Sequence, residues 1–202
     1  VEDLTLVGGV NLQSAVAGKS FATMLSGSVS FSSGGVVSIQ AIDISAPSGF
    51  DGITFTGSSF QQIYLADSVV YSSGVGRSLV MGNSGSGSSV IIDNVNFRSV
   101  SGGTGTPVVI SAGILQGRGS TFWPTTPVST AIDLQGSGIA YLSNADVFGP
   151  IAASGSSTFS LGNSQIRSGN LPGVIDTTSG TILLFDTGFN TIVSGDVVST
   201  DG

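Results

Sequence analysis

The sequence contains no cysteine and no histidine. Without cysteine the chain can form neither a disulfide framework nor a thiolate metal site, a condition compatible with the cytosol or the cell exterior. Together the two absences exclude Ser–His–Asp and Cys–His catalysis as usually built, and zinc sites of the common type. No unperturbed side chain titrates near pH 7. The general acid–base candidates are therefore eleven aspartates and Glu2.

Charge is also scarce, since 8% of the residues are charged and the net charge is −7. The basic residues are scattered rather than clustered, at Lys19, Arg77, Arg98, Arg118 and Arg167. Binding of nucleic acid through phosphate neutralisation is therefore not expected. No apolar run approaches the ~20 residues of a membrane span, so no transmembrane segment is expected either.

The residues that are abundant favour strands and turns. Val, Ile, Phe and Thr dominate the periodic segments, and these residues favour strands. Gly, Ser, Asn and Asp fill the gaps between the segments, as turns require. Residues typical of helices are rare, with a single glutamate and a single lysine in the chain. The composition therefore predicts an all-β protein.

A six-residue pattern recurs about every 24 residues along the chain. It consists of an apolar residue, any residue, Asn, Asp or Gly, two further residues and a second apolar residue. Clear copies are Leu65–Val70, Ile92–Phe97, Leu142–Val147, Leu161–Ile166 and Leu184–Phe189. A repeat of this length is typical of stacked architectures, in which no unit can bury its apolar face alone.

The spacing of the laps carries more information than the pattern itself. Successive laps step by 26, 27, 23, 27, 19 and 23 residues when they are counted from Ile39, Leu65, Ile92, Leu115, Leu142, Leu161 and Leu184. A second series of short apolar strands is predicted at Ile53–Phe55, Leu79–Met81, Val108–Ile110, Ile132–Leu134, Ile151–Ala153 and Val174–Asp176. Both series contain one short lap of 19 residues at the same place, as a coil of fixed cross-section would give.

The repeat predicts a parallel β-helix of about seven coils, whose strands pair in parallel about 4.8 Å apart. The third position of the pattern is expected at one tight bend with positive φ, which Asn, Asp and Gly tolerate best. The residues of this turn ladder are Asp67, Asn94, Asn144, Asn163 and Asp186. A β-sandwich or jelly roll is the alternative, because closely spaced turn signals fit it as well.

Residues 1–34 are expected to form an N-terminal cap or connector, residues 35–190 the β-helix, and residues 191–202 a C-terminal continuation or tail. The chain begins at Val1 rather than Met, and strand-forming residues continue close to its last residue. We therefore expect a processed product or a piece of a longer protein.

In lap length and in the Asn-bearing bend, residues 36–190 resemble the pectate-lyase-like superfamily of right-handed, single-stranded parallel β-helices. The modules that they resemble most are those of viral and phage tailspikes and fibres. The resemblance implies a right-handed coil and a function among polysaccharide cleavage, adhesion and virion attachment. Lyases of this superfamily hold calcium with several carboxylates and use an arginine as base. No acidic cluster is visible in this sequence, so no catalytic residue and no cofactor is predicted.

Two aspartates are the carboxylates to test if the protein is an enzyme. Asp133 and Asp176 lie two laps apart in the second strand series, roughly 10 Å if they face the same way. Glycoside hydrolysis uses carboxyl pairs about 5–9.5 Å apart, so the pair is at the edge of that range. Aspartate is also a favoured turn residue, and for any one of them a structural role is the first expectation. The segment Gly18–Ser20 lacks the earlier glycine of a P-loop, and no nucleotide site is predicted.

Contact with a glycan or receptor would require exposed aromatic side chains. The segment Leu115–Thr130 breaks the repeat and is expected to protrude as a loop that carries Arg118, Phe122 and Trp123. Tyr141 lies near a strand end and is the fourth candidate contact residue. Packing under its own loop, or against a neighbouring subunit, is the alternative for Trp123.

These observations favour a structural, receptor-binding module of a phage or viral spike or fibre, located on the virion or otherwise outside the cell. Its expected partners are itself, as a homotrimer, other virion or surface proteins, and a cell-surface glycan. Outward hydrophobic residues would supply the subunit contacts, with Val69, Val70, Phe148 and Phe189 as candidates. Two alternatives stay open, a polysaccharide depolymerase and a bacterial adhesin or spore-coat fibre.

Overall fold

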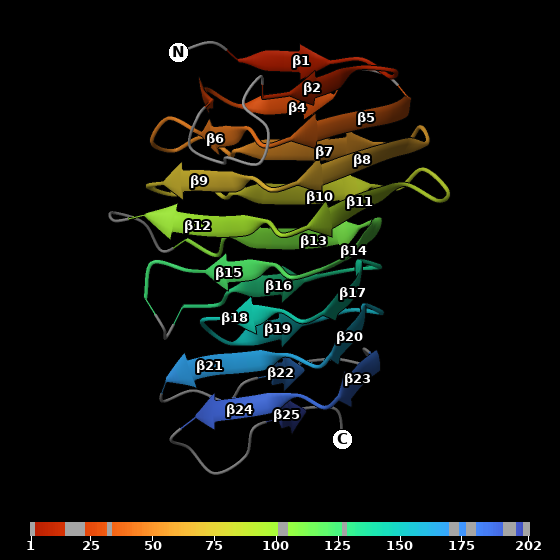
Figure 1. The fold of residues 1–202 in the computed structure, drawn as a ribbon. Coiled ribbons are helices and arrows are strands. Elements are labelled where there is room, and N and C mark those ends of the chain that lie inside the picture. Colours follow the sequence, from red (N-terminus) through yellow and green to blue (C-terminus); the bar gives the residue numbers. More distant parts are fainter. Residues whose placement is uncertain are drawn as a thin grey trace.

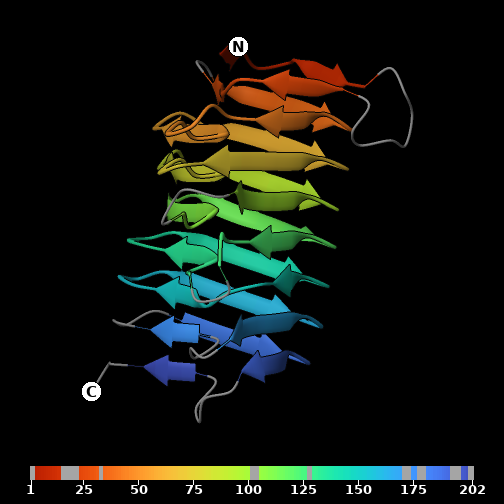
Figure 2. The same ribbon diagram turned by 90° about the vertical axis from the view of Figure 1, so that its left-hand side faces the viewer.

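The computed structural model describes residues 3–14, 23–31, 34–100, 105–126, 129–169, 174–176, 181–191 and 197–199. All regular elements in these ranges are β-strands, and they form three parallel sheets. The strands stack as a β-solenoid, with β1 (Leu4–Leu6) at one end and β25 (Val197–Ser199) at the other (Figures 1 and 2). This arrangement confirms the parallel β-helix and excludes the antiparallel sandwich.

Each sheet forms one wall of the solenoid. Sheet A has nine strands, in the order β1, β4 (Val29–Phe31), β7 (Ile53–Gly57), β10 (Leu79–Asn83), β13 (Val108–Ala112), β16 (Ile132–Leu134), β19 (Ile151–Ala153), β22 (Val174–Asp176) and β25. Sheet B has eight, in the order β2 (Asn11–Gln13), β5 (Gly35–Gln40), β8 (Gln61–Ala66), β11 (Ser89–Asp93), β14 (Ile114–Arg118), β17 (Ile139–Ser143), β20 (Thr158–Gly162) and β23 (Thr181–Phe185). Sheet C also has eight, in the order β3 (Met24–Ser26), β6 (Asp43–Ser45), β9 (Val69–Ser73), β12 (Asn96–Val100), β15 (Thr121–Trp123), β18 (Asp146–Val147), β21 (Gln165–Gly169) and β24 (Gly188–Thr191). About six turns lie between β5 and β22, and each adds a strand to sheets B, C and A in that order.

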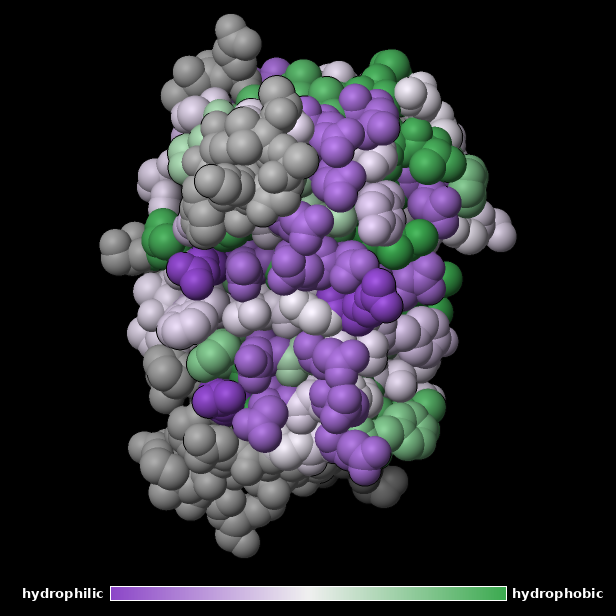
Figure 3. Space-filling model, viewed as in Figure 1, coloured by the Kyte–Doolittle hydropathy of each residue, from purple (hydrophilic) through white to green (hydrophobic). Residues whose placement is uncertain are grey.

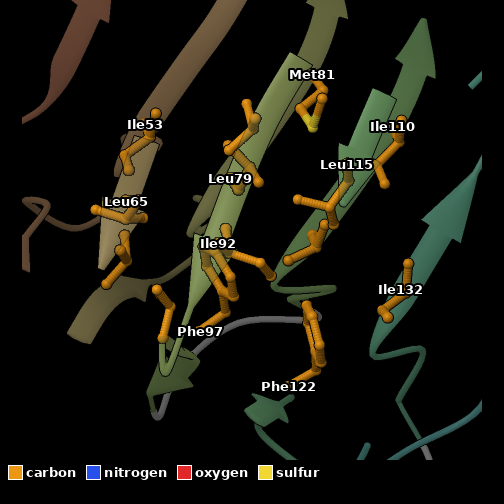
Figure 4. Close-up of a cluster of buried hydrophobic side chains, with 14 of the residues drawn as sticks. Ile53, Leu65, Leu79, Met81, Ile92, Phe97, Ile110, Leu115, Phe122 and Ile132 are labelled. Atoms are coloured by element: carbon orange, nitrogen blue, oxygen red, sulfur yellow. The ribbon is translucent and has the colours of Figure 1, made fainter. Parts of the chain in front are cut away.

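Inward-facing side chains form continuous apolar rows through the solenoid. The second predicted strand series is in register throughout, through the pairs Leu79↔Ile53, Leu79↔Val108, Val108↔Ile132, Ile132↔Ile151 and Ile151↔Val174. In sheet C the rings of Phe97 and Phe122 stack with centroids 5.5 Å apart. Figure 4 shows how these rows meet inside the coil. Each fully buried side chain of this size stabilises the fold by about 1.5–3 kcal/mol.

From β5 to β24 the corner between sheets B and C is uniform. It consists of two residues in each turn, the first of which has positive φ. The predicted ladder residues are all in this set, with φ of 49° at Asp67, 55° at Asn94, 49° at Asn144, 47° at Asn163 and 46° at Asp186. Ala41 (φ 56°) and Gly119 (φ 64°) complete the row. The corner therefore places a residue type that tolerates left-handed backbone at most of its steps.

Hydrogen bonds connect the ladder from turn to turn. The N–H of Asn94 donates to the carbonyl oxygen of Arg118 at 3.0 Å. Equivalent bonds to the next turn are formed by Ala41, Asp67, Gly119, Asn144 and Asn163. The side-chain amide of Asn94 donates to Asp67 Oδ1 at 2.9 Å, and that of Asn163 donates to Asn144 Oδ1. Gly119 lies between Asn94 and Asn144 and offers no side chain, so the side-chain ladder is interrupted there.

The second corner position alternates between apolar and hydroxyl residues from Ile42 to Ser164, and a further hydroxyl residue, Thr187, follows. It is occupied by Ile42, Ser68, Val95, Ser120, Ala145, Ser164 and Thr187. Ser120 Oγ accepts the N–H of Val95 at 3.2 Å and donates to the carbonyl oxygen of Arg118 at 3.1 Å. Ser68 and Ser164 satisfy the N–H groups of Ile42 and Ala145 in the same way. These buried serines supply acceptors that the backbone at the bend does not offer.

The other two corners absorb the variation in lap length. The connections from sheet A to sheet B contain one residue at Gly113 and five at 84–88. Those from sheet C to sheet A contain eight residues at 124–131 and three at 148–150. The three-residue connection accounts for the shared short lap, because both predicted series cross it.

The segment Leu115–Thr130 corrects one prediction. Most of it follows the repeat, since Leu115 and Arg118 lie in β14 and Phe122 and Trp123 in β15. Gly117 rather than Leu115 pairs with Leu142, so the predicted repeat lies two residues too early in this lap. Glycine hides the pattern at this position, because a Cβ at Gly117 would collide with the carbonyl oxygen of Ile92. The connection outside the sheets is confined to 124–131.

The flanking segments also contribute strands to the three sheets. Strands β1 to β4, within the predicted cap or connector, pair in parallel with β4, β5, β6 and β7. At the other end β25 pairs with β22. The solenoid therefore extends beyond residues 35–190 in both directions.

Candidate functional site

The four predicted contact residues separate onto different surfaces. Trp123 is 43% exposed on the outer face of sheet C, and Tyr141 is 44% exposed on the outer face of sheet B. Arg118 is also exposed and lies on sheet B, across the corner from Trp123. Phe122 is fully buried against Phe97, so its prediction as a surface contact is wrong. Residues 122 and 123 alternate in a strand, and one of the two must point inward.

A shallow groove of about 320 Å³ lies on the outer face of sheet B. It is lined by Tyr64, Ile91, Ile92, Asp93, Gln116, Gly117, Arg118 and Ser143. Tyr64, Ile91, Gln116 and Tyr141 occupy one row of paired positions, so Tyr141 continues the lining by one strand. In Figure 3, hydrophobic surface lies toward the right, the side of sheet B, and hydrophilic side chains run along the middle, where sheets B and C meet.

Arg118 forms one side of the groove with Asp93 as its partner. Its Nη2 lies 3.1 Å from Asp93 Oδ2 and its Nε 3.3 Å from Asp93 Oδ1, a two-pronged arrangement. These hydrogen bonds to Asp93 raise the pKa of the Arg118 guanidinium above its ordinary value. The guanidinium remains charged over the whole pH range in which the fold would be studied. The groove thus combines aromatic, amide, hydroxyl and ion-paired groups.

On the outer face of sheet C, arginine and aromatic side chains form a column along the solenoid axis. The guanidinium carbon of Arg98 lies 5.4 Å from the centroid of the Trp123 ring. Trp123 stacks on Phe148 with centroids 4.1 Å apart, and Arg167 lies 5.2 Å from the centroid of Phe148. Tyr71 pairs in register with Arg98 at the next position of this row. We call these five residues the sheet C column.

This packing limits what Trp123 can do. Phe148 covers one side of the indole, and the guanidinium of Arg98 lies over the ring as well. A sugar ring stacks on an aromatic side chain through the ring face. Trp123 therefore offers a ligand its exposed edge rather than a free ring face. Its packing on Phe148 and Arg98 within the same chain agrees in part with the packing alternative stated for Trp123.

The two aspartates proposed for testing do not share a row. Asp133 pairs with Ala152, which pairs with Ile175, whereas Asp176 pairs with Ala153. Asp133 and Asp176 are offset by one residue in register, and successive residues of a strand face opposite sides. The pair therefore does not meet the condition of facing the same way, on which the distance predicted from sequence depended. Asp133 Oδ2 accepts a hydrogen bond from Gln135 Nε2 at 2.6 Å. The side chain of Asp176 lies outside the described set.

In the described part of the chain, no three His, Cys, Asp or Glu side chains gather in a way that could hold a metal ion. The described residues also include no helix that is long and apolar enough to cross a membrane.

The candidates for subunit contacts also change. Val69 and Val70 are buried, so they are unavailable as outward contacts. Phe148 is partly exposed but packs on Trp123, and the side chain of Phe189 lies outside the described set.

The sheet C column was missed from sequence, although a signal for it exists. Tyr71, Arg98, Trp123, Phe148 and Arg167 each follow a corner residue by four positions. Once the corner at Gly119 is assigned, the same offset places all five in one outward row. The misplaced repeat near Leu115 concealed that regularity.

Comparison with known proteins identifies no relative of this chain. No protein-family model, no curated protein and no solved structure matches the chain.

Proposed function

We propose that the chain is a structural, adhesive module, the β-solenoid part of a phage or viral spike or fibre, that attaches to a cell-surface glycan or protein without catalysis. The observation that carries this proposal is the groove on sheet B. Strongly paired parallel strands hold its lining rigid, and Tyr64, Gln116 and Ser143 supply the mixed aromatic and hydrogen-bonding groups that a glycan requires.

The chemistry of the groove supports binding more than cleavage. Asp93 is its one carboxylate, and Arg118 holds both of its oxygens. Glycoside hydrolysis needs a second carboxyl group at a defined distance, which the lining of this groove does not include. A β-solenoid also suits an extended surface fibre, because each turn adds length without changing the cross-section. The virion surface or the cell exterior follows as the proposed location.

The test is a glycan-binding screen with the purified chain and two variants. Tyr64→Ala removes the aromatic side chain from the groove, whereas Phe50→Ala removes an exposed aromatic in the connection between β6 and β7. We expect retention on at least one cell-surface glycan, a loss of about tenfold or more in affinity for Tyr64→Ala, and little change for Phe50→Ala. Equal binding by the parent and Tyr64→Ala would remove the groove from the proposal.

The screened glycan also distinguishes adhesion from depolymerisation. Incubation with the chain should release no reducing ends and no unsaturated products, and Asp133→Asn should behave as the parent does. Product release that Asp133→Asn abolishes would establish the depolymerase alternative instead. A mass measurement in solution tests the proposed homotrimer, with a mass near three times 20.1 kDa as the expected result.

A further inference from the structure

Arg98 differs from the other arginines whose side-chain interactions are described. Arg118 and Arg167 form ion pairs with Asp93 and Asp146, at 3.1 Å and 3.4 Å. Among the described residues Arg98 has no such carboxylate partner, and its contact is with the ring of Trp123. The side chain is exposed in a protein of net charge −7. Arg98 is therefore a cation whose hydrogen-bonding edge is not occupied by a neighbouring acid.

The ring of Trp123 gives this cation a defined orientation. A guanidinium that stacks on an aromatic ring keeps its N–H groups at its rim, where they can meet a carboxylate in a bidentate geometry. Phe148 supports the far side of Trp123, with 4.1 Å between the ring centroids. Part of the conformational entropy that a free arginine loses on binding is thus already lost in the folded protein.

Three neutral, polar residues lie around Arg98, and the carboxylate that continues their row, Asp146 beside Thr121, is paired with Arg167. Tyr71 pairs with it on β9, and Asn96 shares its face of β12. Thr121 lies beside Asn96 on β15. All three are partly exposed, and none is a carboxylate that would compete for the guanidinium. Hydroxyl and amide groups of this kind suit the hydroxyls of a sugar ring better than an apolar protein anchor, which needs a deep pocket.

We infer that Arg98, oriented by Trp123, binds the carboxylate of an acidic saccharide, with Tyr71, Asn96 and Thr121 around the sugar ring. This inference rests on the proposed adhesive function and assigns it a second contact, on sheet C. The net charge of −7 favours a saccharide with isolated carboxylates, because a densely charged polyanion would be repelled. Trp123 acts as a positioning residue, since its exposed edge is beside the ligand and its face holds the arginine.

The single tryptophan of the chain makes the site directly observable. The probe is a glucuronic acid–glucose disaccharide, and its matched control is the same disaccharide with the carboxylate reduced to a hydroxymethyl group. Titration of the folded chain should change the fluorescence of Trp123 saturably with the acidic disaccharide and not with the neutral one. Equal responses to the two sugars, or no response to the acidic one, would overturn the inference.

Variants test the role of Arg98. We expect Arg98→Gln to weaken binding of the acidic disaccharide by about tenfold or more, because a bidentate charged contact is lost. Arg98→Lys should retain part of the affinity, since charge remains without the planar fork. Arg77→Gln, at an exposed position of the connection between β9 and β10, should bind within about twofold of the parent. If Arg98→Gln fails to fold, Arg98→Lys and the sugar comparison decide, and parental affinity in Arg98→Lys together with equal responses to both sugars would reject the site.

The result is separable from that of the proposed function. If a glycan-coated surface retains the parent and Arg98→Gln equally, the inference about sheet C fails and adhesion stands. If no such surface retains the parent while the Trp123 titration saturates, the carboxylate site stands and the adhesive proposal fails.

Discussion

Strand β11 joins two corners of opposite character. At its end lies the corner between sheets B and C, with two residues, Asn94 and Val95, and a hydrogen bond that recurs at each corner from Ala41 to Asn163. At its start lies the connection from sheet A, which has five residues there and a single residue, Gly113, in the next turn. The first corner is a stacked structural element, and the second is a surface loop of adjustable length.

The difference lies in where the backbone polar groups find partners. At the B–C corner the N–H of Asn94 meets the next turn, and the N–H of Val95 meets a buried serine. Any change in the number of residues at this corner therefore disturbs the turns on both sides of it. In the A–B connection Ser86 and Gly87 are exposed, so water can satisfy groups that the protein does not. Substitutions and insertions at the two ends of β11 should therefore have very different costs.

The largest effect is expected from a one-residue insertion. A glycine inserted between Asn94 and Val95 shifts β12 by one residue and turns Phe97 from the core toward solvent. We expect a loss of more than about 4 kcal/mol in the free energy of unfolding, or no folded protein at all. The matched insertion between Ser86 and Gly87 should cost less than about 1 kcal/mol. Urea unfolding of both proteins measures the contrast, and comparable losses would show that the two corners do not differ as argued.

Removing the serine acceptor at the corner should have the next largest effect. Ser120→Ala leaves the buried N–H of Val95 without an acceptor, and we expect a cost of about 1–3 kcal/mol. Ser86→Ala, at an exposed position of the A–B connection, is the control and should change stability by less than about 0.5 kcal/mol. Thermal unfolding of the two variants side by side gives the measurement. A loss in Ser86→Ala as large as that in Ser120→Ala would contradict the assigned role of the buried hydroxyl.

The ladder residue Asn94 separates backbone preference from side-chain hydrogen bonding. Asn94→Ala loses both the tolerance of positive φ and the bond to Asp67, at an expected cost of about 1–2 kcal/mol. Asn94→Gly keeps the permitted backbone and loses only the side chain, so its cost should be smaller. Equilibrium denaturation measures the loss in the free energy of unfolding for each variant. Identical losses would show that the positive-φ conformation of the bend does not contribute to the difference.

The smallest expected effect is a gain at Gly119. Gly119→Asn would close the gap in the side-chain ladder between Asn94 and Asn144 and reduce the entropy of the unfolded chain, for a gain of about 0.5–1 kcal/mol. A Cβ at Gly119 has no heavy-atom neighbour nearer than 3.8 Å, so there is room for the side chain. Gly119→Ala fits the same space without the left-handed preference and should be neutral or destabilising. Calorimetry gives the melting temperatures of the two variants. A higher melting temperature for Gly119→Ala than for Gly119→Asn would refute the proposed closing of the ladder.

The elements predicted correctly are those whose signal is local. Asn94 and Asn144 mark the bend because few residue types accept its φ, and Val108–Ile110 matches its strand because inward rows need large apolar side chains. The prediction failed at Leu115, because Gly117 replaces the expected apolar residue where the backbone of Ile92 approaches closely. The backbone of a neighbouring turn excludes a side chain at residue 117, and the residues next to Gly117 in the sequence do not reveal this restriction.

The candidate contacts depended on that lap and were only partly predictable. Trp123 and Tyr141 are exposed as expected, but they lie on different sheets. Phe122 is inward because it follows the corner at Gly119 by three residues, the offset shared with Phe97 and its corner. The contact of Arg98 with Trp123 joins residues 25 apart, and it appears only when turns are stacked in register.

The sequence by itself determined the all-β class, the period of the coil and the bend that closes each lap, because β-branched rows and left-handed backbone are demands that each residue meets locally. Only the tertiary structure decided which side chains share a surface, such as the groove of Tyr64 and Arg118 or the column of Arg98 and Trp123. The physical reason is that neighbours along the axis lie about 4.8 Å apart in space but a whole lap apart in the chain.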